Sequence, residues 1–285
     1  MKKLILLLIA FCSLNHAFSQ KRQLDIIADS ISTEGKALYK SEFASWYGSD
    51  IFSEKCKTRR AIAGGYISYD SGNGLVNIFF TKEPNPKVLS TITFGYEFNS
   101  QNYKLDTTDR EFTSFEKDLY TIRAAALTRM SRDTVFKIFK NASLNIVPLI
   151  QSKAKKVYVL TGPHANGIVL FGNDYLINFN EKTEVLNVMK QHKGLIVVQT
   201  GKSDTGEVSL AAIHSHLPGY SPYITATDIC TLMLYEGFTN WNQNIVVSKD
   251  FVSIWDCKNN KLVIVTSEAW KKMNSAQNVL ENKSH

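Results

Sequence analysis

Cysteine is scarce in this chain of 285 residues, which contains 4 cysteines, one of them (Cys12) in the apolar N-terminal segment. The other three are Cys56, Cys230 and Cys257, and an odd number allows at most one disulfide bond. No pair has the C-x-x-C spacing of a thiolate zinc site. We therefore expect neither a disulfide framework nor a cysteine-held metal, and we expect Cys230 and Cys257 to be small core residues.

Several motifs of well-known chemistry are also missing. The chain contains no G-x-S-x-G, no G-x-x-x-x-G-K-[ST], no H-E-x-x-H and no G-x-G-x-x-G, so no nucleotide cofactor is expected. The formal net charge is +7, but the lysines are scattered and no basic stripe alternates with aromatic residues. Single-strand binding favours such a stripe, so we expect no nucleic acid among the partners.

Long hydrophobic runs are absent, and the apolar segment 4–12 is too short to cross about 30 Å of hydrocarbon. Two lysines precede this segment, and Ala17-Phe18-Ser19 places small residues where a signal peptidase cuts. The pattern predicts a signal peptide over residues 1–19, cleaved before Gln20, and a secreted or periplasmic protein with no transmembrane segment. A lipoprotein site at Cys12 is the alternative, although bulky Phe11 precedes it.

Residues 20–150 are expected to fold as an α+β region of unknown function. Apolar residues at helical spacing predict a helix over residues 20–50. Segments rich in β-forming residues predict an antiparallel three-stranded meander, with strands at 66–69, 75–81 and 88–98. Thr108 and Glu111 have the spacing of a capping box, which predicts that a helix begins there. Residues 131–152 are expected to form a short helical stretch and a loop.

A change of pattern near residue 150 suggests a second domain over residues 151–285, again of the α+β class. Helices are expected at 225–235 and 267–280. Strands are expected at 157–160, 167–179 with a break at 172–174, 195–200, 208–216, 245–248, 251–255 and 262–266.

Metal-competent side chains are concentrated in one stretch of this second domain. His214 and His216 lie two apart in a predicted strand, so both side chains face the same way. Thr225 and Asp228 follow at the start of a predicted helix, where the free N–H groups favour a carboxylate. Two imidazoles and one carboxylate predict a zinc site whose fourth position stays open for water. The alternative is a plain capping box beside two ordinary histidines, with no metal.

These residues resemble the signature of the JAB/MPN (JAMM) metalloprotease superfamily, which is His-Ser/Thr-His followed by Ser-x-x-Asp. The matching positions are His214-Ser215-His216 and Thr225-x-x-Asp228, and the resemblance covers about residues 156 to 266. It implies a mixed β-sheet with flanking helices. It also implies that His214, His216 and Asp228 are zinc ligands, and that Thr225 hydrogen-bonds the water or the reacting oxygen. The implied activity is hydrolysis of a peptide or isopeptide bond, with a peptide or protein as substrate or ligand.

The general base of that family is a Glu in the motif E-x-x-G-x-L-x-G, and His164 stands at the matching position of this chain. His164 is our candidate base, because the pKa of histidine lies near neutrality. The alternatives are an additional ligand and a surface residue without a role. Asp174 and Glu184 are other candidates, whereas Glu207 is about 23 Å along an extended strand from His214 at roughly 3.3 Å per residue. We expect His192 to be exposed.

Two functions therefore follow from the sequence. The first is a secreted zinc hydrolase. The second, favoured by the missing Glu, is a catalytically inactive JAB/MPN-like binding protein of the cell envelope or the secreted fraction.

Overall fold

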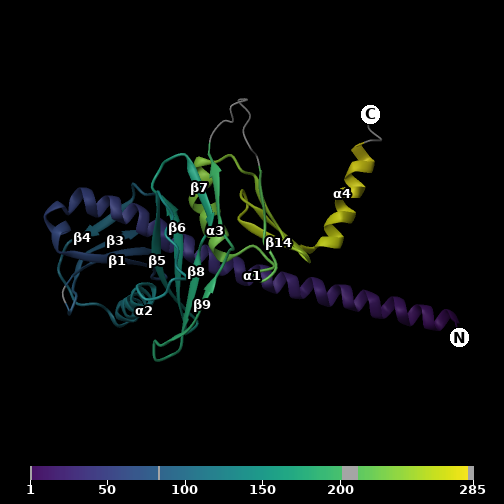
Figure 1. Cartoon of the computed structure of the whole chain (residues 1–285), viewed down its shortest axis with the longest axis horizontal. Coiled ribbons are helices and arrows are strands. Elements are labelled where there is room, and N and C mark those ends of the chain that lie inside the picture. Colours follow the sequence, from purple (N-terminus) through teal and green to yellow (C-terminus); the bar gives the residue numbers. More distant parts are fainter. Residues whose placement is uncertain (1, 83, 201–210, 282–285) are drawn as a thin grey trace.

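The computed structural model describes residues 2–82, 84–200 and 211–281. Its longest helix, α1 (Lys2–Lys55), confirms the helix expected over residues 20–50, and its N-terminal end extends away from the body (Figure 1). Among the described residues, no helix is both long enough and apolar enough to cross a membrane. Cleavage before Gln20 stays a prediction.

One helix contributes to the core of both halves of the protein. Leu24 and Ala28 of α1 are buried with residues of the C-terminal sheet, whereas Phe43 and Phe52 are buried against the N-terminal meander. The expected division at residue 150 therefore does not separate two independent cores, because the apolar face of α1 is shared between them.

The expected meander is confirmed, with one strand more than the sequence predicts. The strands pair in chain order, each antiparallel to the next, and a short 3-10 helix, η1 (Lys57–Ile62), precedes them. They are β1 (Ala63–Asp70), β2 (Leu75–Thr81), β3 (Val88–Phe94) and β4 (Tyr103–Asp106). Every residue of β2 is buried, because α1 covers one side of this strand and α2 lies on the other side of the sheet.

Helix α2 (Ser114–Met130) begins at a different capping box from the expected one. Thr113 and Glu116 exchange the reciprocal bonds, at 3.2 and 2.8 Å. The capping box predicted at Thr108 and Glu111 is wrong. The pairs Thr108–Glu111 and Thr113–Glu116 have the same spacing. Glu116, however, is fully buried and also accepts two hydrogen bonds from Arg110 at 2.7 Å, and these contacts favour a helix that begins after Thr113.

The helical stretch predicted within residues 131–152 is wrong, because residues 131–141 form turns and irregular structure and residues 142–151 form a strand. A four-stranded antiparallel sheet has the order β5 (Ala142–Gln151), β6 (Ala154–Pro163), β8 (Tyr175–Phe179) and β9 (Val185–Lys190). Pro148 is tolerated since β5 is an edge strand. The expected domain boundary at residue 150 falls inside β5, which pairs with β6 along its whole length.

The C-terminal part confirms the expected closing meander and both expected helices. β11 pairs in parallel with β12, and β12, β13 and β14 are antiparallel neighbours; β7 and β10 form a separate pair. These strands are β7 (Ile168–Gly172), β10 (Leu195–Gln199), β11 (Ala211–Ser215), β12 (Gln243–Val247), β13 (Phe251–Asp256) and β14 (Lys261–Thr266). The helices are α3 (Ala226–Tyr235), η2 (Glu236–Phe238) and α4 (Ser267–Glu281).

Helix α3 packs against α1 and shares a core with α1 and the C-terminal sheet, and this packing positions the site. Ile229 and Leu232 of α3 are buried with Val246 and Trp255 of the sheet. Helix α4 projects from the body after β14 (Figure 1). The protein thus belongs to the α+β class, with several mainly antiparallel sheets and a few helices.

Candidate metal centre

The first turn of α3 holds the carboxylate at the centre of the site. Thr225 is the N-cap, and its hydroxyl accepts from the Asp228 N–H at 3.1 Å. In return, Asp228 Oδ2 accepts from the Thr225 N–H at 2.9 Å and from the Thr225 hydroxyl at 2.8 Å. Asp228 is almost completely buried, so these bonds fix the direction of its carboxylate.

β11 delivers the two histidines that the sequence singles out. The strand pairs His214 with Val246 of β12, and the His216 N–H donates to the Val247 carbonyl at 2.9 Å, directly after the strand ends. His214 Nε2 lies 3.8 Å from Asp228 Oδ1, and His216 Nε2 lies 3.6 Å from Asp228 Oδ2. The structure therefore places both predicted histidines within 3.8 Å of the Asp228 carboxylate, while the closest group of ligand atoms contains His216 and Asp228 but not His214.

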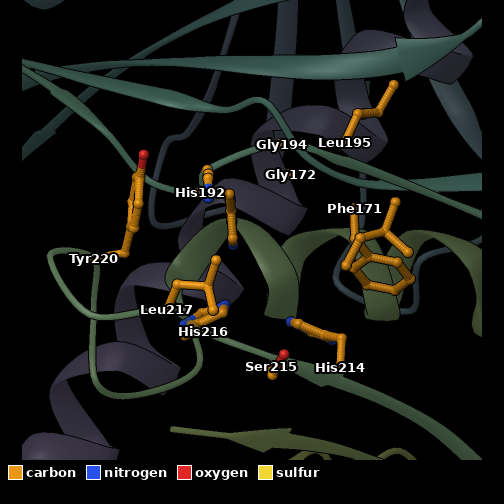
Figure 2. Close-up of a pocket in the computed structure, with 12 residues that line it drawn as sticks. Phe171, Gly172, His192, Gly194, Leu195, His214, Ser215, His216, Leu217 and Tyr220 are labelled. Carbon is orange, nitrogen blue, oxygen red and sulfur yellow. The ribbon is translucent and has the colours of Figure 1, made fainter. Parts of the chain in front are cut away.

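A third histidine, which the sequence reasoning missed, completes the cluster. His192 was expected to be exposed, but the residue is only 7% exposed and its Nε2 lies 3.1 Å from Asp228 Oδ1. It sits between β9 and β10, and its polar neighbours Gln191 and Lys193 gave no sign of burial. No local signal could have identified it, because the residues that His192 contacts are distant from it in the sequence. Figure 2 shows the three imidazoles directed toward one another.

One imidazole has a hydrogen-bond partner on its far side, and a second has a carboxylate nearby. His216 Nδ1 lies 3.1 Å from the Ser221 carbonyl, so an Nδ1–H donated to this oxygen leaves Nε2 free to bind a metal. His192 Nδ1 lies 3.7 Å from Asp174 Oδ2. Asp174 is itself held by the Thr161 N–H, which donates to its Oδ1 at 2.9 Å.

The charges of the cluster depend on one another. Burial alone would raise the pKa of Asp228, but the three imidazoles outweigh burial and hold it well below its usual range. Burial opposes protonation of His192 as well, yet the carboxylates of Asp228 and Asp174 raise its pKa to about 9. For His214 and His216, burial is the largest influence and lowers the pKa below 6.5. Burial raises the pKa of Asp174 to about 6.

The donor set fits a metal ion. His192, His216 and Asp228 form a buried group in which one ligand atom from each lies within 4.8 Å of the others. Within the described residues, His214 Nε2, His216 Nε2 and Asp228 Oδ1 have no hydrogen-bond partner. Buried polar atoms are rarely left without a partner, and both of these nitrogens lie within 3.8 Å of the Asp228 carboxylate, so the set fits a cation. Imidazole nitrogens with a carboxylate oxygen form a donor set typical of zinc.

One pocket gives access to the three imidazoles. Its volume is about 440 Å³, and its other lining residues are Phe171, Gly172, Lys193, Gly194, Leu195, Ile196, Ser215, Leu217 and Tyr220. Thr225 and Asp228 lie behind the histidines and do not line it. A ligand that entered this pocket would therefore meet the imidazoles first, between largely apolar walls.

The candidate bases divide into one residue at the site and several elsewhere. His164 is exposed in the turn after β6 and lines no part of the pocket, and its N–H donates to the Asn141 carbonyl at 3.0 Å. Glu184 is engaged with Asn180 in the β8–β9 turn at 2.7 Å. Of the two candidate carboxylates that the structure describes, Asp174 is the one that approaches the cluster, through His192. Glu207 lies outside the described residues.

The cysteines and the comparisons with known proteins add little to the site. Cys56, Cys230 and Cys257 are all buried and unbridged, and the burial of Cys230 and Cys257 confirms that they are core residues. No protein-family model, no curated protein and no solved structure matches the chain. Arguments about function therefore depend on the cluster and on the signature residues themselves.

Proposed function

We propose that this protein binds zinc through His214, His216 and Asp228 and hydrolyses peptide or isopeptide bonds in the manner of the JAB/MPN family. The observation that carries the proposal is the convergence of these three side chains, buried and with ligand atoms left unpartnered. The His-Ser-His and Thr-x-x-Asp signature supports the same three ligands. The predicted signal peptide would place this activity in the secreted or periplasmic fraction.

The residues around the ligands have separate tasks in this proposal. When bound, zinc would polarise a carbonyl and lower the pKa of a coordinated water. Thr225 positions the Asp228 carboxylate, since its hydroxyl proton is already donated to Asp228 at 2.8 Å. Ser221 orients the His216 ring from behind. The apolar walls of the pocket, among them Phe171 and Leu217, suit the side chains of a peptide.

Metal analysis of the purified protein tests the proposal. We expect about one zinc per chain by mass spectrometry, and its loss in the double variant His214→Ala/His216→Ala. His164→Ala is the matched control, because it removes a histidine that lies outside the pocket and should leave the zinc content unchanged. Absence of zinc after loading, in a protein that remains folded, would refute the metal centre. If the protein does bind zinc, a screen against peptide and isopeptide substrates tests the hydrolysis.

A second candidate function is metal-dependent binding without catalysis. The observation in its favour concerns the family's catalytic Glu, whose matching residue here is the exposed His164. Under this function the zinc-loaded protein would bind a peptide or an envelope component in the pocket, with no turnover. A zinc-loaded protein that retains peptides from a library but cleaves none of them would favour this function.

A further inference from the structure

We propose that His192 is a fourth protein ligand of the metal and closes the position that a water or substrate would need, with Asp174 as its positioning residue. This inference rests on the metal centre proposed above and specifies how that centre is regulated. The sequence signature does not include His192, and the expected open position does not exist if His192 occupies it.

The first argument is the distance between ligand atoms. In a tetrahedral zinc site with bonds of about 2.0–2.1 Å, the ligand atoms lie about 3.4 Å apart. His192 Nε2 lies 3.1 and 3.2 Å from the two oxygens of Asp228. His216 and His214 lie at 3.6 and 3.8 Å from the same carboxylate. His192 is therefore at least as well placed for coordination as the two signature histidines.

The second argument is the arrangement of the rings. The rings of His192 and His216 lie 5.0 Å apart edge to face, and those of His214 and His216 lie 5.2 Å apart. The His216 ring thus has the other two rings as neighbours at similar distances, and the Nε2 atom of each histidine lies within 3.8 Å of the Asp228 carboxylate. Three imidazole nitrogens and one carboxylate oxygen are the number of ligands that a tetrahedral zinc site requires.

The third argument is the carboxylate behind His192. Metal-bound histidines usually donate their second ring N–H to a carboxylate, a carbonyl or a water. Asp174 Oδ2 lies 3.7 Å from His192 Nδ1, and within the described residues that nitrogen has no hydrogen-bond partner. A small movement of the ring would bring the two atoms into hydrogen-bond range while Nε2 remains on the metal.

The backbone holds His192 in place from both sides. The Gln191 N–H donates to the Asp174 carbonyl at 2.8 Å, and the Asn173 N–H donates to the Gly194 carbonyl at 2.9 Å. Gly172 fits against this turn because a Cβ at its position would lie 2.4 Å from the Gly194 oxygen. Since the chain is fastened before and after His192, the ring is a built part of the site.

The consequence is a closed metal site. Four protein ligands are typical of structural zinc, whereas catalytic zinc keeps one position for water. Hydrolysis at this centre would then require His192 to leave the metal, so residues 191–194 would control access. Removing the imidazole should open the site to small ligands.

Cobalt-loaded protein with acetohydroxamate as the probe tests this inference. We expect the visible spectrum of the wild-type full chain to show four-coordinate cobalt and to remain unchanged when millimolar acetohydroxamate is added. In His192→Ala, acetohydroxamate should change the spectrum, and cobalt affinity should fall by at least about 10–100-fold. Asp174→Asn should weaken cobalt binding by about 10–100-fold and keep the four-coordinate spectrum. His164→Ala, the matched control, should behave as wild type.

A wild-type spectrum that responds to acetohydroxamate as His192→Ala does, with equal cobalt affinity in both proteins, would overturn the inference and leave the metal centre intact. No cobalt uptake by the wild type would remove the metal centre itself and the inference with it. If His192→Ala does not fold, X-ray absorption of the zinc-loaded wild type decides: three imidazole ligands support the inference, and two refute it.

Discussion

The proton on His192 gives a prediction whose size follows from the structure. In the metal-free protein, the carboxylates of Asp228 and Asp174 raise the pKa of His192 from 6.5 to about 9. This rise in pKa corresponds to at most about 3 kcal/mol of folding free energy. Because the folded pKa is the higher one, this stabilisation is fully present below about pH 6.5 and is lost as the pH rises toward 9.

Urea unfolding of chelator-treated protein between pH 6.5 and pH 9 measures the effect. We expect the unfolding free energy of the wild type to fall across this range, and that of His192→Gln to stay nearly constant. His214 and His216 do not interfere, since burial lowers their pKa and any contribution from them is lost below pH 6.5. A wild-type profile that is as flat as that of His192→Gln would show that the two carboxylates do not hold a proton on this ring.

Three further predictions concern separate parts of the molecule. Burial raises the pKa of Glu42 from 4.5 to about 7, so the wild type loses unfolding free energy, on the order of 3 kcal/mol, as the pH rises between these values. Glu42→Gln should not show this loss. Urea unfolding in which the variant is no more stable than the wild type at pH 8 would contradict the prediction. Thr225→Val keeps the buried volume but removes the cap, and should lower the unfolding free energy by about 1–2 kcal/mol, whereas an unchanged value would mean that the cap is not needed. Zinc at about 1,000 times its Kd should add about 4.1 kcal/mol and raise Tm by about 8–16 °C in calorimetry. His216→Ala should abolish that rise and His164→Ala should keep it; an equal loss in both variants would count against the site.

Much of the C-terminal fold could be predicted because its signals are local. The closing meander combines alternating or continuous β-forming residues with short polar turns, and α3 begins at a hydroxyl residue three positions before a carboxylate. Local patterns also identified Thr225 and Asp228 at the helix cap and His214 and His216 in the strand. A helix cap and a strand each place side chains by short-range geometry. The cluster they form in the structure agrees with that reasoning.

The failures have the opposite origin, since each depends on tertiary contacts. Two capping boxes of equal spacing competed for α2, and the burial of Glu116 beside Arg110 decided between them. Residues 131–152 were expected to form a short helical stretch and a loop, because the pairing of β5 with β6 and its edge position, which tolerates Pro148, cannot be read from the residues of β5 alone. His192 joins the site only because β9 and β10 bring residues 191–194 against the turn at 172–174.

The metal-free site is electrostatically balanced, which explains how the chain can fold before a metal binds. Asp228 keeps its charge within the protein interior, and an uncompensated buried carboxylate would be strongly unfavourable. The proton on His192 supplies the compensating charge at 3.1 Å, in the place where a cation would sit. Zinc binding then replaces this proton with a divalent cation, and at pH 7.5 displacing a proton held with a pKa of about 9 costs about 2 kcal/mol. Zinc affinity should therefore rise about tenfold per pH unit from pH 6.5 toward 9 in competition with a chelator of known affinity. A pH-independent affinity would mean that metal and proton do not share this position.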